Sequence, residues 1–415
     1  MFKQHLVVIV FVFLVFTSHV TAANNPIDNE RSTEGGADSI SNINYDHYNW
    51  FEKLSIRGYA QVRYNRLMET NPDLRCEQCD RSWGKNGGFS FRRIRLIFFG
   101  NVHPRVFVYI QPDFASTIGG SGNVAQIRDA YFDLALNESK TYRLRIGQSK
   151  VPFGFENLQS SQNRIPLDRN DGMNSAVANE RDLGVFFYWA PENIRRRFAE
   201  LVSNNLKGSG DYGVFGLGIY NGHTANQMER NESPHLVARA TYPFKLDNGQ
   251  MFETSLQAYH GKFVVNNISD NLNPGRREFT ERRAAATFVL YPQPFGLVME
   301  YNVGFGPEYN PETNSIESLP LRGGFTQAHY YLEHKTYGLF IPFVRWHQYS
   351  GGKKHELDAR RHRVDEQEIG VEWQPHRNFE LVVMYTFSDR TFEDALIPTN
   401  RQRGRLLRIQ AQVNF

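Results

Sequence analysis

Apolar and polar residues alternate along most of the chain, and the alternation is clearest in residues 142–146. Every second residue of this stretch is apolar, and the two residues between them are Arg143 and Arg145. In an extended strand this pattern places an apolar surface on one face and two charged side chains on the other. Pro152 then ends the strand and leads into a polar segment of about 30 residues. Such a strand is typical of the wall of a water-filled barrel in a lipid bilayer.

Alternating runs recur along residues 54–415, separated in turn by short connections and by long polar loops. The pattern predicts strands over residues 54–67, 89–100, 105–113, 125–136, 141–149, 182–189, 234–244, 251–265, 281–291, 295–304, 325–333, 337–349, 363–374, 378–388 and 403–415. Residues 197–221 predict one further strand with a Gly-rich bulge, or two strands. The count is therefore about 16 strands, and no helix of useful length is predicted. Short periplasmic turns, long outer loops and an even number of strands indicate an all-β, antiparallel transmembrane barrel.

The two ends of the chain support this interpretation. Residues 1–22 have the features of a secretory signal peptide, with Lys3 before an apolar run and a small-residue cleavage site at Ala22. Residues 23–53 are polar and predict a flexible periplasmic segment, so the barrel domain is expected over residues 54–415. The last strand ends at Phe415, where it can close the barrel against the first strand. We expect the same strand end to bind the barrel-assembly machinery.

The composition agrees with a membrane barrel and excludes several other classes. Hydrophobic residues make up 40% of the chain and aromatic residues 14%, and the mean hydropathy is −0.53. These values are too polar for a helical membrane protein, whereas a barrel exposes half of its strand residues to water and gathers aromatic residues at the membrane interfaces. Tyr59, Tyr142 and Trp346 are assigned to that lipid-facing set. The net charge of +3 gives no reason to expect nucleic-acid binding. The 13 histidines show no triad spacing, so an enzyme is not expected.

The only two cysteines are Cys76 and Cys79. In an exported protein this spacing predicts a local disulfide within a loop. A thioredoxin-like motif would need a βαβ context, which the pattern lacks. Half of a zinc site is the weaker alternative, because no second Cys/His pair lies at ligand spacing.

The lumen is expected to carry its two signs of charge on different walls, if the more apolar face of each strand points outward. The predicted basic wall and constriction loop contain Arg57, Arg63, Arg93, Arg95, Arg105, Arg143, Arg145 and Lys150. The predicted acidic wall contains Glu300, Glu333, Glu368 and Glu372. Arginine stays charged and offers forked donors to phosphate or carboxylate, and a series of weak sites lets an ion move on.

These charges predict a pore for passive diffusion of small solutes that prefers anions such as phosphate. The acidic wall leaves a general, zwitterion or sugar pore as the first alternative. A closed structural or adhesive barrel is an alternative of another class.

Four stretches resemble the phosphate-selective porin family of Gram-negative outer membranes. They are QIRDAYFD at residues 126–133, GQSKVPFGFE at 147–156, ERDLGV at 180–185 and YNG at 220–222. The resemblance covers residues 54–415 and implies a homotrimer of 16-stranded barrels. It also implies that the third outer loop, here residues 150–181, folds into the lumen and that basic residues pass anions along. Outer-membrane lipid and small phosphate-like anions are the implied partners, and no cofactor is implied.

Overall fold

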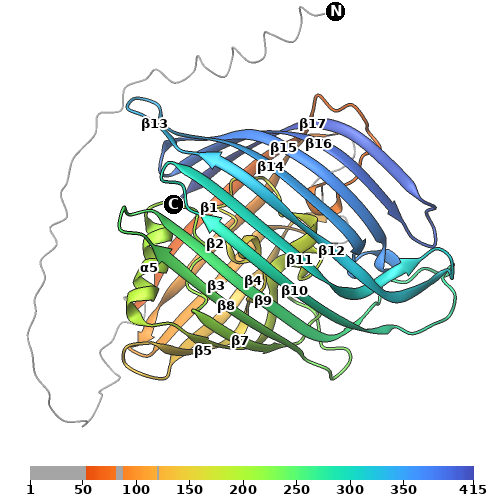
Figure 1. The fold of residues 1–415 in the computed structure, drawn as a ribbon, viewed down its shortest axis with the longest axis horizontal. Helices are drawn as coiled ribbons and strands as arrows, with labels where there is room; N and C mark the ends of the chain where they lie inside the picture. The colour runs from red at the N-terminus through yellow and green to blue at the C-terminus, as the bar shows by residue number, and fades with distance from the viewer. Residues whose placement is uncertain (1–52, 81–86, 119–120) are drawn as a thin grey trace, which may run out of the picture. The chain divides into compact units, whose positions relative to one another are not determined.

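The computed structural model describes residues 53–80, 87–118 and 121–415, so the predicted signal peptide (1–22) and the segment 23–53, apart from Lys53, lie outside the described residues. Antiparallel strands form one sheet that closes on itself, because β1 pairs with β17 (Figure 1). The short strand β13 continues β12 within the same hairpin, and the barrel therefore has 16 strands as predicted. The strands are β1 Ser55–Leu67, β2 Phe89–His103, β3 Val106–Ile118, β4 Ser121–Ala135, β5 Tyr142–Lys150, β6 Arg181–Trp189, β7 Phe215–Tyr220, β8 His235–Lys245, β9 Met251–Val264, β10 Glu278–Leu290, β11 Phe295–Asn310, β12 Ser315–Tyr330, β13 Leu332–His334, β14 Gly338–Gly352, β15 Arg361–His376, β16 Phe379–Glu393 and β17 Asn400–Asn414.

The helical elements are short, with one exception. They are α2 Glu77–Asp80, α3 Phe155–Leu158, α4 Asp171–Asn174, the 3₁₀ turns η3 Ala178–Glu180 and η4 Leu357–Ala359, and the longer α5 Glu192–Ser203. Within the described residues, no helix is both long and apolar enough to span a bilayer.

The seam between the first and last strands closes the barrel. Phe415 donates its backbone N–H to the carbonyl of Gly58 at 3.0 Å, and Gly58 donates back at 2.7 Å. A Cβ atom at Gly58 would lie 2.7 Å from the Phe415 ring, so the close approach of the two strand ends requires glycine there. Because β1 and β17 pair with each other, the sheet has no open edge strand that faces lipid among the described residues.

The alternation along each strand separates a lipid-facing side from a lumen-facing side. In β17, Leu407, Ile409 and Val413 are at least partly exposed on the outer side, whereas Arg408 and Gln412 are buried on the inner side. The assignment of Tyr59 to the lipid face is wrong, because this side chain is completely buried and its hydroxyl accepts a hydrogen bond from Arg95 at 2.9 Å.

The prediction for residues 197–221 is also wrong. Only Phe215–Tyr220 forms a strand (β7), and α5 occupies Glu192–Ser203. Ile194, Phe198 and Leu201 are the buried residues of α5, and their spacing of four and three residues is that of a helix face. The expectation that no helix of useful length occurs fails for the same reason. Strands β11 and β12 are also longer than predicted, since they pair up to Asn310 and Ser315.

The orientation of the barrel follows from its connections. Both ends of the strand series and most short turns lie at one end, which in outer-membrane barrels faces the periplasm. The connection from β6 to β7 also belongs to this end, and Figure 1 shows α5 at the end of the barrel where the chain terminates. This connection differs from the others at that end because it is long and contains a helix.

Candidate functional site

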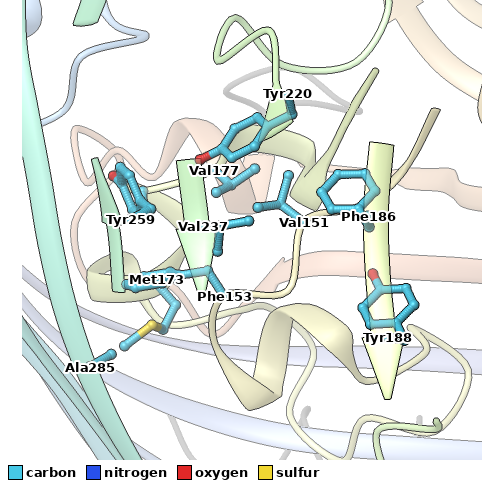
Figure 2. Close-up of a cluster of buried hydrophobic side chains, with 11 residues drawn as sticks. Val151, Phe153, Met173, Val177, Phe186, Tyr188, Tyr220, Val237, Tyr259 and Ala285 are labelled. Carbon is cyan, nitrogen blue, oxygen red and sulfur yellow. The ribbon is translucent and has the colours of Figure 1, made fainter. Parts of the chain in front are cut away.

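The segment between β5 and β6, residues 151–180, folds into the lumen, and we call it the constriction loop. Nearly all of its side chains are buried. Apolar residues attach both ends of the loop to the wall of β6 to β10, as Figure 2 shows. The cluster comprises Val151, Phe153, Met173, Ala176 and Val177 of the loop and Phe186, Tyr188, Tyr220, Val237, Tyr259 and Ala285 of the wall. A lumen lined only by solvated polar groups would lack such a cluster, so the loop is held in place by apolar burial as well as by charge.

Asp168 anchors the middle of the constriction loop to the seam of the barrel. Its carboxylate lies 3.0 Å from Arg63 Nη1 and 2.5 Å from Arg408 Nη1, and Arg92 approaches at 3.3 Å. Burial alone would raise the pKa of Asp168, but the three guanidinium groups outweigh burial and hold that pKa well below its ordinary value. The carboxylate therefore stays ionised and keeps the loop tied to β1 and β17.

Asp171 forms a second anchor, which ties the loop to β14 and β16. It contacts Lys353 Nζ at 2.5 Å and Arg390 Nη2 at 2.8 Å, and His347 Nε2 lies 3.5 Å away. Burial alone would raise the pKa of Asp171. The neighbouring cations lower this pKa by more than burial raises it, so the pKa lies well below its ordinary value. Asp171, His347 and Glu366 lie close enough to ligate one metal ion. Because Lys353 and Arg390 already neutralise the two carboxylates, we interpret this group as an anchor and not as a metal centre.

Three of the four predicted acidic-wall residues, Glu300, Glu368 and Glu372, are buried, and two of them are paired with cations. Glu368 binds Arg345 at 2.5 Å and Arg408 at 3.1 Å, and Glu372 binds Lys207 Nζ at 2.6 Å. Arg345 also holds Glu156 of the constriction loop at 2.7 Å. Glu300 accepts hydrogen bonds from the backbone N–H of Phe155 and from the Thr287 hydroxyl. The loop therefore lies against this wall and separates it from the free part of the lumen.

Glu333 does not belong to the acidic wall. It lies in β13, where all three residues are exposed. The strand is interrupted at Tyr331, and its last residues extend into the turn that leads to β14. The alternation of inward and outward positions along the strand could not show that the wall ends before Glu333.

The upper half of the predicted basic wall contacts the constriction loop. Besides Arg63, this group includes Lys150, which donates to the carbonyls of Leu158 and Gln159 at 2.9 and 2.8 Å. Arg95 pairs with Asp113 at 2.8 Å. Arg93 donates to Gln61 at 2.8 Å and pairs with no carboxylate of the described chain.

The lower half of the basic wall lies toward the periplasmic end. Arg145 pairs with Asp133 at 2.7 Å, and its guanidinium stacks over the Tyr131 ring at 4.0 Å from the centroid. Arg143 pairs with Asp211 at 2.7 Å. Arg57 and Arg105 are exposed. Arg57 lies over the Phe99 ring, and Arg105 donates to the carbonyls of Ala135 and Leu136 at the end of β4.

Two adjoining cavities of about 570 and 230 Å³ border this lower basic wall. They share Arg57, Arg145 and Asp211 among their lining residues. The basic residues that line them are Arg57, Arg105, Lys140, Arg143, Arg145, Lys150, Arg181 and Arg195, and the acidic ones are Asp129, Asp133 and Asp211. No residue of the predicted acidic wall borders either cavity. The space left by the constriction loop is thus lined by an excess of positive charge.

Several residues of this region were not identified from the sequence. Arg181 binds Asp129 at 2.8 Å, and Arg169 binds Glu180. Arg164 is buried in the constriction loop, donates to loop carbonyls and pairs with no carboxylate of the described residues. Arg164 and Arg169 lie in a segment without strand periodicity, and Arg181 is the first residue of β6, so the sequence assigned no face to them. The available signal was the number of arginines within residues 164–181.

Cys76 and Cys79 are joined by a disulfide across α2, with their Cα atoms 5.1 Å apart. Gln78, one of the two residues between them, donates to the carbonyl of Arg169 at 2.9 Å and accepts from the Asn174 side chain. The disulfide therefore closes the turn that carries Gln78, and Gln78 holds this turn against the constriction loop.

Replacing both cysteines by serine is expected to loosen this contact, since a closed loop of this size stabilises by roughly 2 kcal/mol. We expect a noisier and slightly larger single-channel current than in the parent protein. A reducing agent should produce the same change in the parent and none in the double variant. A parent current that is insensitive to reduction would contradict the clamp.

The closed barrel, its periplasmic turns and its loop-narrowed lumen define an outer-membrane porin. The chain belongs to the phosphate-selective porin O and P family, whose profile matches residues 71–415. It is therefore a channel protein of the Gram-negative outer membrane.

Solved porins share this fold at low sequence identity. The outer-membrane channel DcaP of Acinetobacter baumannii is 14% identical, with a TM-score of 0.54 over 87% of this chain and 97% of that one. OmpF of Salmonella typhi, in complex with daunomycin, is 12% identical, with a TM-score of 0.53 over 89% and 99%. An anion-selective porin from Comamonas acidovorans is 10% identical, with a TM-score of 0.51 over 87% and 99%. No curated protein sequence matches significantly. The family and these neighbours are channels and not enzymes.

Proposed function

We propose that this porin passes small anions such as phosphate by passive diffusion along its basic wall. The observation that carries the proposal is the charge around the free space, where eight basic and three acidic side chains line the two cavities. The family to which the chain belongs is described as phosphate-selective, and one structural neighbour is described as anion-selective.

The pairing of Glu368 and Glu372 supports an anion pore over a general or zwitterion pore. Glu368 and Glu372 each have a cation within 2.6 Å. Arg345 joins Glu368 to Glu156 of the constriction loop, and Lys207 of the connection between β6 and β7 binds Glu372. Their charges therefore cancel locally and do not create a field across the free lumen.

The mechanism follows from the spacing of basic residues along β5 and its neighbours. Arg143 and Arg145 occupy successive inward positions, so their Cα atoms are roughly 7 Å apart along the strand. Each has one carboxylate partner and spare N–H donors, which lets a phosphate oxygen bind without displacing the partner. Further up, Lys150 and Arg181 line the second cavity and continue this basic row. A row of such moderate sites binds an anion weakly enough for it to move on.

The test is the reversal potential of single channels in a tenfold KCl gradient, with phosphate added as a blocker. We expect an anion-preferring parent, and a variant with Arg143, Arg145 and Lys150 all changed to glutamine should lose most of that preference. One lumen charge is worth about 1 kcal/mol or more, which corresponds to roughly fivefold in relative permeability per charge.

The matched control changes the same number of charges on the outer side of β17, with Arg401, Arg403 and Arg405 replaced by glutamine. These side chains are exposed and face away from the lumen. The control should keep the parent reversal potential. A parent that prefers cations, or a lumen variant that matches the control, would refute anion conduction; a protein that passes no current would be the closed structural or adhesive barrel.

We further propose that the channel is a homotrimer that contacts its partners through the wall of β5 to β9. Strands β5, β6 and β7 are short, and an apolar groove of about 560 Å³ crosses their outer side. Leu144, Phe187 and Leu217 line it. Lipid would cover the remaining outer wall, and the strand end at Phe415 is the proposed contact for the barrel-assembly machinery.

A further inference from the structure

The connection between β6 and β7, residues 190–214, enters the lumen from the periplasmic end, and we call it the periplasmic insert. Its helix α5 buries Ile194, Phe198 and Leu201 in a cluster with Phe155 of the constriction loop. The wall contributes Met251, Val289, Tyr291, Val298 and Phe325 to the same cluster. The insert is thus packed against both the wall and the constriction loop.

Polar contacts extend the insert across to the far wall. Lys207 of the insert binds Glu372 of β15 at 2.6 Å, and both side chains are almost completely buried. Two residues before Lys207, the Asn205 side chain donates to Gln374 at 2.9 Å, and the Asn205 backbone carbonyl accepts from the Tyr331 hydroxyl at 2.6 Å. Gln159 of the constriction loop donates to the carbonyl of Lys207 at 2.7 Å. The two lumen segments are therefore joined and narrow the pore together.

Asp211 is the acidic residue that the insert presents to the free lumen. Its carboxylate contacts Arg143 of β5 at 2.7 Å and Arg195 of α5 at 3.1 Å. It also accepts the backbone N–H of Gly213 at 3.0 Å, which fixes its position. The side chain lines both cavities and is 19% exposed, so an ion in either cavity experiences its charge.

We propose that the periplasmic insert is a second constriction and that Asp211 sets the selectivity of this constriction. By sharing its charge between Arg143 and Arg195, Asp211 limits how tightly the lower basic wall holds an anion and so allows the anion to leave toward the periplasm. The inference rests on the proposed anion conduction and goes beyond it, because it assigns the exit step to a segment outside the strand wall.

The experiment compares two single variants with opposite expected effects. Asp211→Asn frees two guanidinium groups, and we expect the anion-to-cation permeability ratio to rise about threefold to fivefold. Blocks by added phosphate should also last longer. Arg195→Gln leaves Asp211 to neutralise Arg143 alone, and the ratio should fall by a similar factor. A purely structural loosening of the insert would move both variants in the same direction.

Asp247→Asn is the matched control, because Asp247 is exposed on the turn between β8 and β9 at the same end of the barrel. It should leave the permeability ratio unchanged. The proposal is overturned if Asp211→Asn behaves like this control, or if both insert variants shift the ratio in one direction. Each shift is measured relative to the parent, so the sign of the parent's own selectivity tests the proposed function separately. If one variant does not insert into membranes, the direction of the change in the permeability ratio of the other variant still tests the proposal.

Discussion

Replacing Asp168 and Asp171 together by asparagine is expected to release the constriction loop and to raise the single-channel conductance. The two carboxylates hold Arg63, Arg408 and Arg390 along with the other cations that surround them. Breaking a buried ion pair by removing one partner costs about 3–5 kcal/mol, because the remaining charge is left without compensation. Small shifts of the constriction loop cannot regain the free energy lost with both ion pairs. The apolar contacts at its two ends should keep the loop attached but leave its middle free to swing away from the wall.

The effect is measured as conductance in planar bilayers and as cleavage of residues 164–170 by trypsin, which needs the buried Arg164 or Arg169 to become accessible. The control is the double change of Asp73 and Asp270 to asparagine, since both are exposed in outer loops. It should match the parent in both measurements. An unchanged conductance with unchanged protection of Arg164 would show that the apolar clusters alone hold the loop.

The wall of the barrel could be predicted because one simple rule governs it. A residue of a strand faces either lipid or lumen, and this choice appears directly in the alternation of β9 and β17. Closure at Phe415 followed from the same rule. The periplasmic insert could not be predicted in this way, because its buried residues follow a helical spacing within a region interpreted as strand.

The charge map shows a different limit. Parity indicated which side chains face inward, but not which charges remain available to a solute. That depends on pairs formed across great sequence distances, such as Arg408 with Asp168, which are 240 residues apart. Glu368 and Arg63 are structural anchors for the constriction loop, whereas Arg143 and Arg145 border free space. Inward-facing arginines therefore have two roles: some anchor the constriction loop, and others border free space. Only the path of the constriction loop decides which role each arginine has.

Replacing Phe198 by alanine is expected to detach α5 from the lumen without affecting the barrel wall. The Phe198 ring is 2% exposed and lies in the cluster that joins the periplasmic insert to the constriction loop. Removing a buried phenylalanine costs about 3 kcal/mol or more, because its contacts are lost and a cavity remains. The backbone hydrogen bonds between the barrel strands do not depend on this ring. The substitution should therefore lower the free energy of local opening of the insert and leave the free energy of global unfolding unchanged.

Limited proteolysis measures this opening directly, because α5 contains Arg195, Arg196 and Arg197 in sequence. Cleavage that requires local opening follows the population of the open state, so 3 kcal/mol predicts a rate increase of about 100-fold at these arginines. Val202→Ala is the control on the same helix, since Val202 is 38% exposed and its loss should change the rate little. Equal cleavage of both variants would mean that α5 is held by its polar contacts. In that case Lys207 and its pair with Glu372 would be the segment's anchor, and a change at Lys207 would reproduce the effect expected for Phe198.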